Sequence, residues 1–140
     1  MRITINENSG LILILPDDYK PVKLPMRDEW ITALLSGEYQ QGKNFLFSDN
    51  KYCCLGVLSR IQGRLTKTSG SDFFIDGCNG SYIGLSYDNP VYQVLNSCGK
   101  LSKKIKVYFN KLRYGSLDLL NDNGVTFADI AKIIKFVYES

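Results

Sequence analysis

The chain has 140 residues, 44% of them apolar, and its 17 Lys and Arg against 14 Asp and Glu give a formal charge of +3. This length is typical of one domain with its own core, and so small a charge does not mark a protein whose main partner is a nucleic acid. The longest apolar run, LILIL at 11–15, is too short to span a membrane, and the first residues lack the pattern of a signal peptide. We therefore expect one cytoplasmic domain spanning residues 1–140, with no membrane partner.

The chain contains four cysteines and no histidine. Without an export signal, we expect Cys53, Cys54, Cys78 and Cys98 to be reduced thiols. There is no Cys-x-x-Cys pair, so the usual zinc ligand sets are missing, and we expect neither a metal nor another cofactor. The commonest general base of enzymes is absent as well.

The N-terminal segment predicts a β-hairpin, because RITI (2–5) and LILIL (11–15) flank a turn that contains Gly10. The second run is apolar at every position, so we expect other parts of the chain to cover both of its faces. The following PDDYKPVKLP (16–25) contains three prolines and predicts a connecting loop.

A short amphipathic helix is predicted in MRDEWITALLSG (26–37), where Gly37 suits the left-handed position that ends a helix. A second hairpin follows in FLFSDNKYCC (45–54), with a turn in SDNK. From Cys54 onward the apolar period changes to helical, and Gly63 is the expected stop.

The C-terminal half predicts a third hairpin in 71–85, two helical pieces in 89–112 broken at Gly99, and a short helix in 116–124. In the stretch 100–113, basic residues alternate with aromatic ones, a pattern found in nucleic-acid binders, but we interpret the lysines as one solvated helix face. The last helix has the clearest start, because Thr126 is a good N-cap with Asp129 three residues later. These elements predict an α+β fold of short β-hairpins and short α-helices, ending in an amphipathic helix.

The stretch KYCCLGVL (51–58) raises the question of a reactive thiol, because both cysteines precede a predicted helix. Cys54 shares its helix face with Val57, Leu58 and Ile61, and a free cysteine is often buried as a small apolar residue. We therefore interpret the stretch as a strand-to-helix corner of the core, in which Gly56 lets another part of the chain approach closely.

The loop EYQQGKN (38–44) is the candidate ligand site, since Tyr39 offers a ring for stacking and Gln41, Lys43 and Asn44 offer polar groups. Two further cations, Arg60 and Arg64, lie downstream of the loop and are expected to meet an anion if they fold back beside it. A plain connecting loop is the alternative.

Two motif matches fail on inspection. NDNG (121–124) resembles the middle of a calcium loop, but the position of the required glutamate is Ile130. The glycines of SGEYQQGKN are spaced as in a phosphate-binding loop, but the Ser or Thr is missing. We interpret NDNG as a connection between two helices.

Three segments, WITALLSGEYQQG (30–42), YCCLGVL (52–58) and LNDNGVTFADIAKII (120–134), together resemble a widespread group of small, mostly uncharacterised bacteriophage and prophage proteins. Their shared motifs are SGEYxQG, CCLGVL and NDxGxxFxxIA. Where relatives often have another cysteine and then an acid, this chain has Ser59 and Arg60, which argues against a role that needs a third thiol. Residues 26–140 form the part that resembles the family, and the hairpin of residues 1–25 is an addition that offers an edge for self-association into a homo-oligomer.

The resemblance implies a phage-encoded, non-enzymatic accessory protein that antagonises host antiviral defence in the cytoplasm of an infected bacterium. The leading hypothesis is that it sequesters a nucleotide-derived immune signal. The alternative is an inhibitor that binds a host defence protein directly through a sheet edge or a tyrosine-rich surface, formed by Tyr82, Tyr87, Tyr92, Tyr108 and Tyr114. An enzyme that cleaves the signal is disfavoured by the missing histidines.

Overall fold

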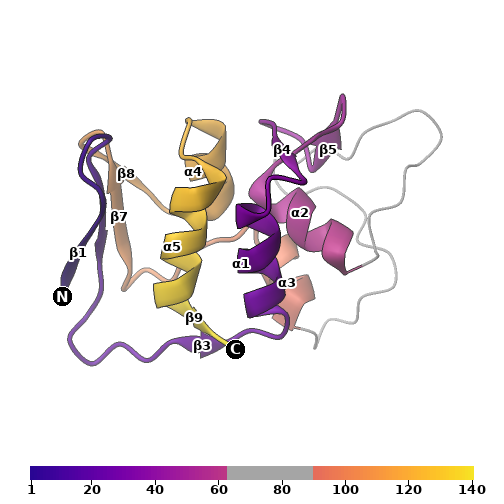
Figure 1. Cartoon of the computed structure of the whole chain (residues 1–140). Helices are drawn as coiled ribbons and strands as arrows, with labels where there is room; N and C mark the ends of the chain where they lie inside the picture. The colour runs from indigo at the N-terminus through magenta and orange to yellow at the C-terminus, as the bar shows by residue number, and fades with distance from the viewer. Residues whose placement is uncertain (63–89) are drawn as a thin grey trace.

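A computed structural model describes residues 1–62 and 90–140 of the chain (Figure 1). It confirms an α+β fold, with short helices and short strands combined in one small domain. The hairpin predicted in 71–85 lies outside the described residues.

The described helices pack side by side next to the largest sheet. α5 lies between that sheet and α1, and α1 also contacts α2 (Figure 1). Within the described residues, none of the helices has the length and apolar character needed to cross a bilayer. Their bounds are α1 (Arg27–Leu35), α2 (Cys54–Ile61), α3 (Pro90–Asn96), α4 (Leu117–Asp122) and α5 (Phe127–Val137).

The largest sheet has four strands in the order β1-β2-β7-β8, and all three neighbouring pairs are antiparallel. Its first two strands are the predicted N-terminal hairpin, and β7 adds to that hairpin from the other half of the chain. We call this four-stranded sheet the main sheet. Its strands are β1 (Arg2–Asn6), β2 (Leu11–Ile14), β7 (Lys106–Phe109) and β8 (Leu112–Tyr114).

Two smaller sheets complete the described strands. The first pairs β3 (Val22–Lys23), within the predicted proline-rich loop, with β9 (Tyr138–Glu139) in parallel. The second, which we call the small sheet, has the order β4-β6-β5 and contains the predicted hairpin of residues 45–54. Its strands are β4 (Gln40–Gln41), β5 (Phe47–Ser48) and β6 (Lys51–Tyr52).

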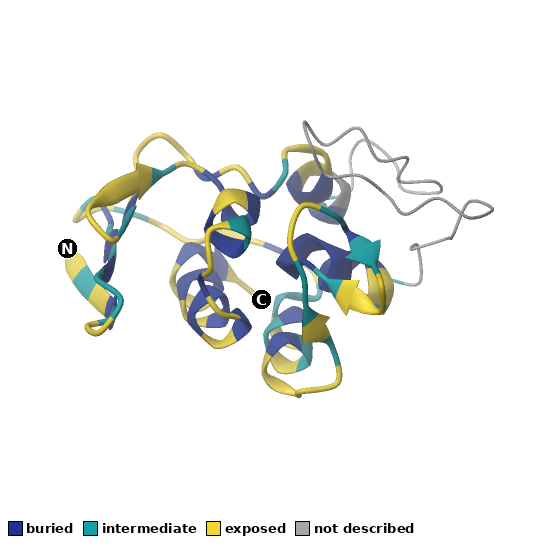
Figure 2. Ribbon diagram, turned by 90° about the horizontal axis from the view of Figure 1, so that it is seen from above, coloured by how far each residue is buried: buried dark blue, intermediate teal, exposed yellow. Residues whose placement is uncertain are grey.

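The core lies between the helices and on the inner face of the main sheet, as the buried segments in Figure 2 show. At its centre Trp30 is completely buried, and its indole Nε1 donates a hydrogen bond of 2.9 Å to the carbonyl oxygen of Cys54. A buried indole N–H needs such a partner, so this bond fixes how α1 lies against the start of α2.

The predicted end of α1 and the predicted start of α5 are confirmed, whereas Gly63, the expected stop after α2, lies outside the described residues. Gly37, just past α1, has φ +78°, the left-handed value expected there. At the start of α5, the Thr126 hydroxyl oxygen accepts a hydrogen bond of 3.3 Å from the backbone N–H of Asp129. α4 follows Ser116 as expected, although the Ser116 hydroxyl makes no capping hydrogen bond there.

The second helical piece predicted in 89–112 is wrong, because residues 106–109 and 112–114 are β7 and β8. The sequence alternates lysine and tyrosine with buried Ile105 and Val107, which is the period of a strand. Asn110 and Lys111 both have positive φ and form a two-residue turn between β7 and β8. Tertiary pairing with β2 decides the conformation of this segment.

Two further expectations are wrong. Only one face of LILIL is fully buried: Leu11 and Leu13 point inward, while Ile12 and Ile14 are half-buried on the other face, which no described element covers. Cys98 is disulfide-bonded, so it is not a reduced thiol, whereas Cys53 and Cys54 are free and buried.

The close approach predicted at Gly56 is confirmed by the backbone of Leu46, which lies directly against it. A Cβ added to Gly56 would overlap the Leu46 carbonyl oxygen and lie 2.7 Å from the carbonyl carbon. Neither backbone can move without shifting α2 or the segment that leads into β5.

We therefore expect Gly56→Ala to lower the free energy of unfolding by about 3 kcal/mol, because overpacking against backbone forces the helix to shift. Denaturant unfolding measures this change. Gly115→Ala is the matched control, since its new Cβ would meet no atom within 4 Å. Equal stabilities of the two variants would contradict the close packing.

Candidate functional site

The predicted loop 38–44 contains β4 of the small sheet, and its Tyr39 belongs to an aromatic cluster with side chains of β5 and β6. The Tyr39 and Tyr52 rings meet edge to face with centroids 5.2 Å apart, and Phe47 lies 4.7 Å from Tyr52 on the other side. All three side chains are partly exposed. Tyr39 is therefore held by ring packing and lies at the surface, as a stacking residue would.

Gln41 is used inside the protein, although the sequence suggested a ligand-binding side chain. Its Nε2 donates to the Asn121 side-chain oxygen at 2.9 Å and to the Val125 carbonyl oxygen at 2.8 Å. Its Oε1 accepts from the backbone N–H of Phe127 at 3.0 Å. Both amide hydrogens and the oxygen are thus engaged, and a ligand would have to break these bonds to use them.

Asn121, the first residue of the NDNG segment that the sequence predicted as a plain connection, is the partner that completes this network. It is completely buried, and its Nδ2 donates to the Gly42 carbonyl oxygen at 2.8 Å. Its Oδ1 also accepts from the backbone N–H of Cys54 at 3.2 Å. The first backbone N–H groups of a helix have no acceptor within the helix. Asn121 provides an acceptor for the first N–H of α2, and Gln41 provides one for the first N–H of α5.

The two adjacent cysteines belong to this structural corner, as predicted. The Cys53 sulfur caps α2 by accepting from the backbone N–H of Gly56 at 3.3 Å, and the Cys54 thiol lies 3.6 Å from the Leu117 carbonyl oxygen. Burial raises the pKa of both thiols well above the ordinary value. Within residues 1–62 and 90–140, no three Cys, Asp or Glu side chains come together as metal ligands.

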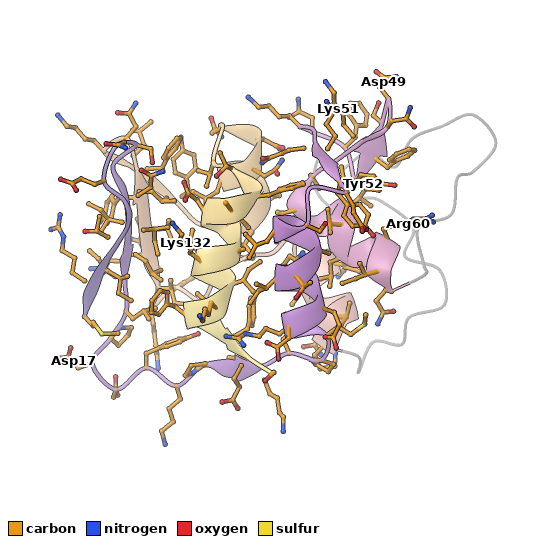
Figure 3. All side chains as sticks on the ribbon, viewed as in Figure 1. Asp17, Asp49, Lys51, Tyr52, Arg60 and Lys132 are labelled. Atoms are coloured by element: carbon orange, nitrogen blue, oxygen red, sulfur yellow. The ribbon has the colours of Figure 1, made fainter. Side chains whose placement is uncertain are left out.

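The remaining predicted site residues do not share one pocket. Lys43 lines a pocket of about 200 Å³ at the outer end of the small sheet, beside Asp49 and Lys51. Figure 3 shows Asp49 and Lys51 at this end, whereas Arg60 lies well away from them on α2. Asn44 is exposed, and its backbone N–H donates to the Asp122 carboxylate at 2.9 Å. Arg64 lies outside the described residues.

The volume of this pocket argues against a nucleotide there. Sites for small molecules and cofactors usually enclose about 300 to 1,000 Å³. A space of about 200 Å³ lies below that range, so it suits an ion or a water cluster better than a base with its sugar.

A larger groove, of about 680 Å³, lies on the outer face of the main sheet. Residues directly opposite each other in the register share a face, which places Ile12 beside Tyr108 and Arg2 beside Ile14. We call this the sheet groove. It is lined by Arg2, Glu7, Asn8, Ser9, Gly10, Ile12, Ile14, Tyr108, Asn110 and Lys111.

The composition of the sheet groove suits an anionic ligand with a flat apolar part. Ile12, Ile14 and the half-buried Tyr108 form an apolar floor, and Arg2 and Lys111 are exposed cations. Glu7 is the acidic side chain of the lining. Aliphatic and aromatic surface with a few polar groups around it is typical of small-molecule sites.

The sequence signal for this groove was the LILIL run itself. An apolar residue at every position predicted cover on both faces, and the structure leaves Ile12 and Ile14 partly exposed to the groove. A ligand is one way in which such a face becomes covered.

Comparison with known proteins adds little about chemistry. Residues 22–73 are similar to a family described as a domain of unknown function, DUF8296. The match covers less than half of the chain and includes the small sheet and α2, but not the residues that line the sheet groove. No curated protein and no solved structure matches the chain.

The structural role of Gln41 is tested by Gln41→Glu. A carboxylate would face the Asn121 oxygen and the Val125 carbonyl as a third acceptor, so we expect the free energy of unfolding to fall by about 2 to 3 kcal/mol. The control is Gln40→Glu, at an exposed neighbouring position. If both variants unfold at the same denaturant concentration as the parent, Gln41 does not hold the fold together.

The raised pKa of Cys53 and Cys54 predicts that neither thiol reacts in the native protein. Because both pKa values are shifted upward, the thiolate is scarce at about pH 8 and the sulfurs are shielded from solvent. Iodoacetamide should leave the tryptic peptide YCCLGVLSR (52–60) unmodified unless the protein is first denatured. Rapid native alkylation of this peptide would contradict the burial.

Proposed function

We propose that the protein is a phage-encoded, non-enzymatic accessory protein that binds and sequesters a nucleotide-derived immune signal of its bacterial host. The observation that carries this proposal is the sheet groove, with its apolar floor, its half-buried tyrosine and its two cations. The phage origin, the antagonism of host defence and the location in the cytoplasm of the infected cell rest on the sequence resemblance.

A nucleotide matches the groove part by part. The Tyr108 ring offers a face on which a base can stack, and Ile12 and Ile14 offer apolar contact to the base and the sugar. Arg2 and Lys111 offer charged hydrogen-bond donors to phosphate oxygens. The exposed side-chain amides of the turn residues Asn8 and Asn110 can offer polar contacts.

Binding without turnover fits the residues at hand. The chain has no histidine, and the thiols of Cys53 and Cys54 are buried with raised pKa values, so neither supplies a nucleophile at neutral pH. The proposal therefore assigns the ligand to capture rather than to cleavage, and it moves the predicted site from loop 38–44 to the sheet groove.

A second candidate function, direct inhibition of a host protein, is favoured by the β8 edge of the main sheet, which pairs with no further strand of residues 1–62 and 90–140. β8 is an edge strand, and its Leu112 side chain is 61% exposed. Such an edge can add a strand from a partner, or from a second copy of the chain. Of the tyrosines first considered, Tyr108 lies in the groove and Tyr114 packs near Phe109, while Tyr82, Tyr87 and the side chain of Tyr92 lie outside what is described.

Native mass spectrometry of the protein purified from defence-activated host cells tests the proposal. We expect a retained mass in the nucleotide range that mild denaturation releases, and we expect Tyr108→Ala to lose it because the stacking face is gone. Tyr39→Ala is the matched control: it removes a surface tyrosine from the predicted loop and should keep the ligand.

The opposite pattern, with ligand lost in Tyr39→Ala and kept in Tyr108→Ala, would return the site to the loop. A host polypeptide in place of any small molecule would favour the second candidate function. The same spectra report whether the chain self-associates.

A further inference from the structure

The two cations of the sheet groove lie at opposite ends of it. Arg2 begins β1 and shares a cross-strand row with Ile14 and Lys106, whereas Lys111 lies in the turn at the far end of β7. From Lys106 to the turn the chain advances four residues, or about 13 Å along the strand. The row that contains Tyr108 and Ile12 lies between the two ends.

The turn that presents Lys111 is unusual in its sequence. Asn110 and Lys111 have φ +49° and +69°, so both are left-handed, as in the two-residue hairpin turns that favour Asn-Gly. A lysine at the second position accepts a conformation that glycine adopts without steric cost. The chain thus keeps a cation at the end of the groove where backbone geometry favours glycine.

The end of the groove near Lys111 is held in place by neighbouring turns. The Asn6 side-chain oxygen accepts from the backbone N–H of Asn8, and its Nδ2 donates to the Asp129 carboxylate at 2.8 Å. Gly10 lies against the backbone of Asn110: a Cβ added to Gly10 would be 3.7 Å from the backbone nitrogen of Asn110. These contacts hold the backbone of the turn that carries Lys111 in place relative to Tyr108, while the Lys111 side chain itself is exposed.

Resting on the proposed function, we propose that the ligand of the sheet groove is a dinucleotide, with one phosphate at the Arg2 end and another at the Lys111 end. A mononucleotide clusters its phosphates at one end of the molecule and leaves the second cation unpaired. A dinucleotide places a base between two separated phosphates, and Tyr108 lies in the same order between two cations. The long exposed side chains of Arg2 and Lys111 can reach inward along the groove to phosphates that lie closer together than the two ends of the strand. Glu7 lies at the Lys111 end and reduces its positive charge, so this end suits the singly charged diester and the Arg2 end suits the terminal phosphate.

Isothermal titration calorimetry with the linear dinucleotide pApA and with ADP tests this inference. The two probes have the same formal charge, but ADP concentrates its charge at one end. We expect pApA to bind about tenfold more tightly than ADP, since it gains one further charged contact.

The variants Arg2→Ala and Lys111→Gly should each weaken pApA about tenfold. Lys111→Gly also suits the positive φ of the turn, so a lower melting temperature cannot explain its loss of affinity. Lys20→Ala removes an exposed lysine outside the groove and should leave both affinities unchanged.

The results distinguish nucleotide binding in the sheet groove from a preference for a dinucleotide. If ADP binds as tightly as pApA and both are lost in Tyr108→Ala, the groove binds nucleotides and the dinucleotide inference is overturned. If neither probe binds, the proposed nucleotide capture fails together with the inference. If a six-nucleotide oligoadenylate binds far more tightly than pApA, the groove follows a single strand, and the dinucleotide is not its ligand.

Discussion

The hydrogen-bonded pair formed by the Gln41 and Asn121 side chains holds the fold together at one point. It joins β4, the start of α2, the end of α4 and the start of α5, through bonds of 2.8 to 3.2 Å. Two helices begin at this pair, because each amide satisfies the first free N–H of one of them. Buried polar networks of this kind stabilise a single arrangement when every member is satisfied, and they are costly when one member is lost.

The start of α5 extends this constraint toward the sheet groove. The backbone N–H of Phe127 donates to Gln41, and the Thr126 hydroxyl oxygen caps α5 by accepting from the backbone N–H of Asp129. The Asp129 carboxylate in turn accepts a hydrogen bond from the Asn6 side chain in the main sheet. A single helix end therefore positions the small sheet on one side and the β1–β2 turn on the other. Gln41 lies in the segment similar to the family of unknown function, residues 22–73. All residues that line the sheet groove lie outside that segment.

The sequence predicted the elements whose signals are local. Thr126 and Asp129 marked the start of α5, Gly37 marked the end of α1, and the turn residues around Gly10 marked the first hairpin. β7 was predicted as a helix, because its lysines suggested a solvated helix face and its pairing with β2 spans most of the chain. Gln41 was interpreted as a ligand-binding side chain because its actual hydrogen-bond partners lie 80 or more residues away in the sequence. No local pattern identifies such partners.

The residues of the sheet groove are also brought together by pairing between distant parts of the chain. Tyr108 and Lys111 line one groove with Arg2 and Ile12 only because β7 joins the N-terminal hairpin, so the sequence showed the apolar excess of LILIL without showing what surrounds it. The structure turns that excess into a groove with a defined charge pattern.

An NMR titration of the ¹⁵N-labelled protein with pApA would locate the ligand most directly. If the ligand occupies the sheet groove, the amide signals of Ile12, Ile14, Tyr108 and Lys111 should shift together and saturate with one affinity, while those of Lys43 and Arg60 stay unchanged. Shifts confined to residues 39–44 and Arg60, with a silent main sheet, would contradict the groove as the binding site.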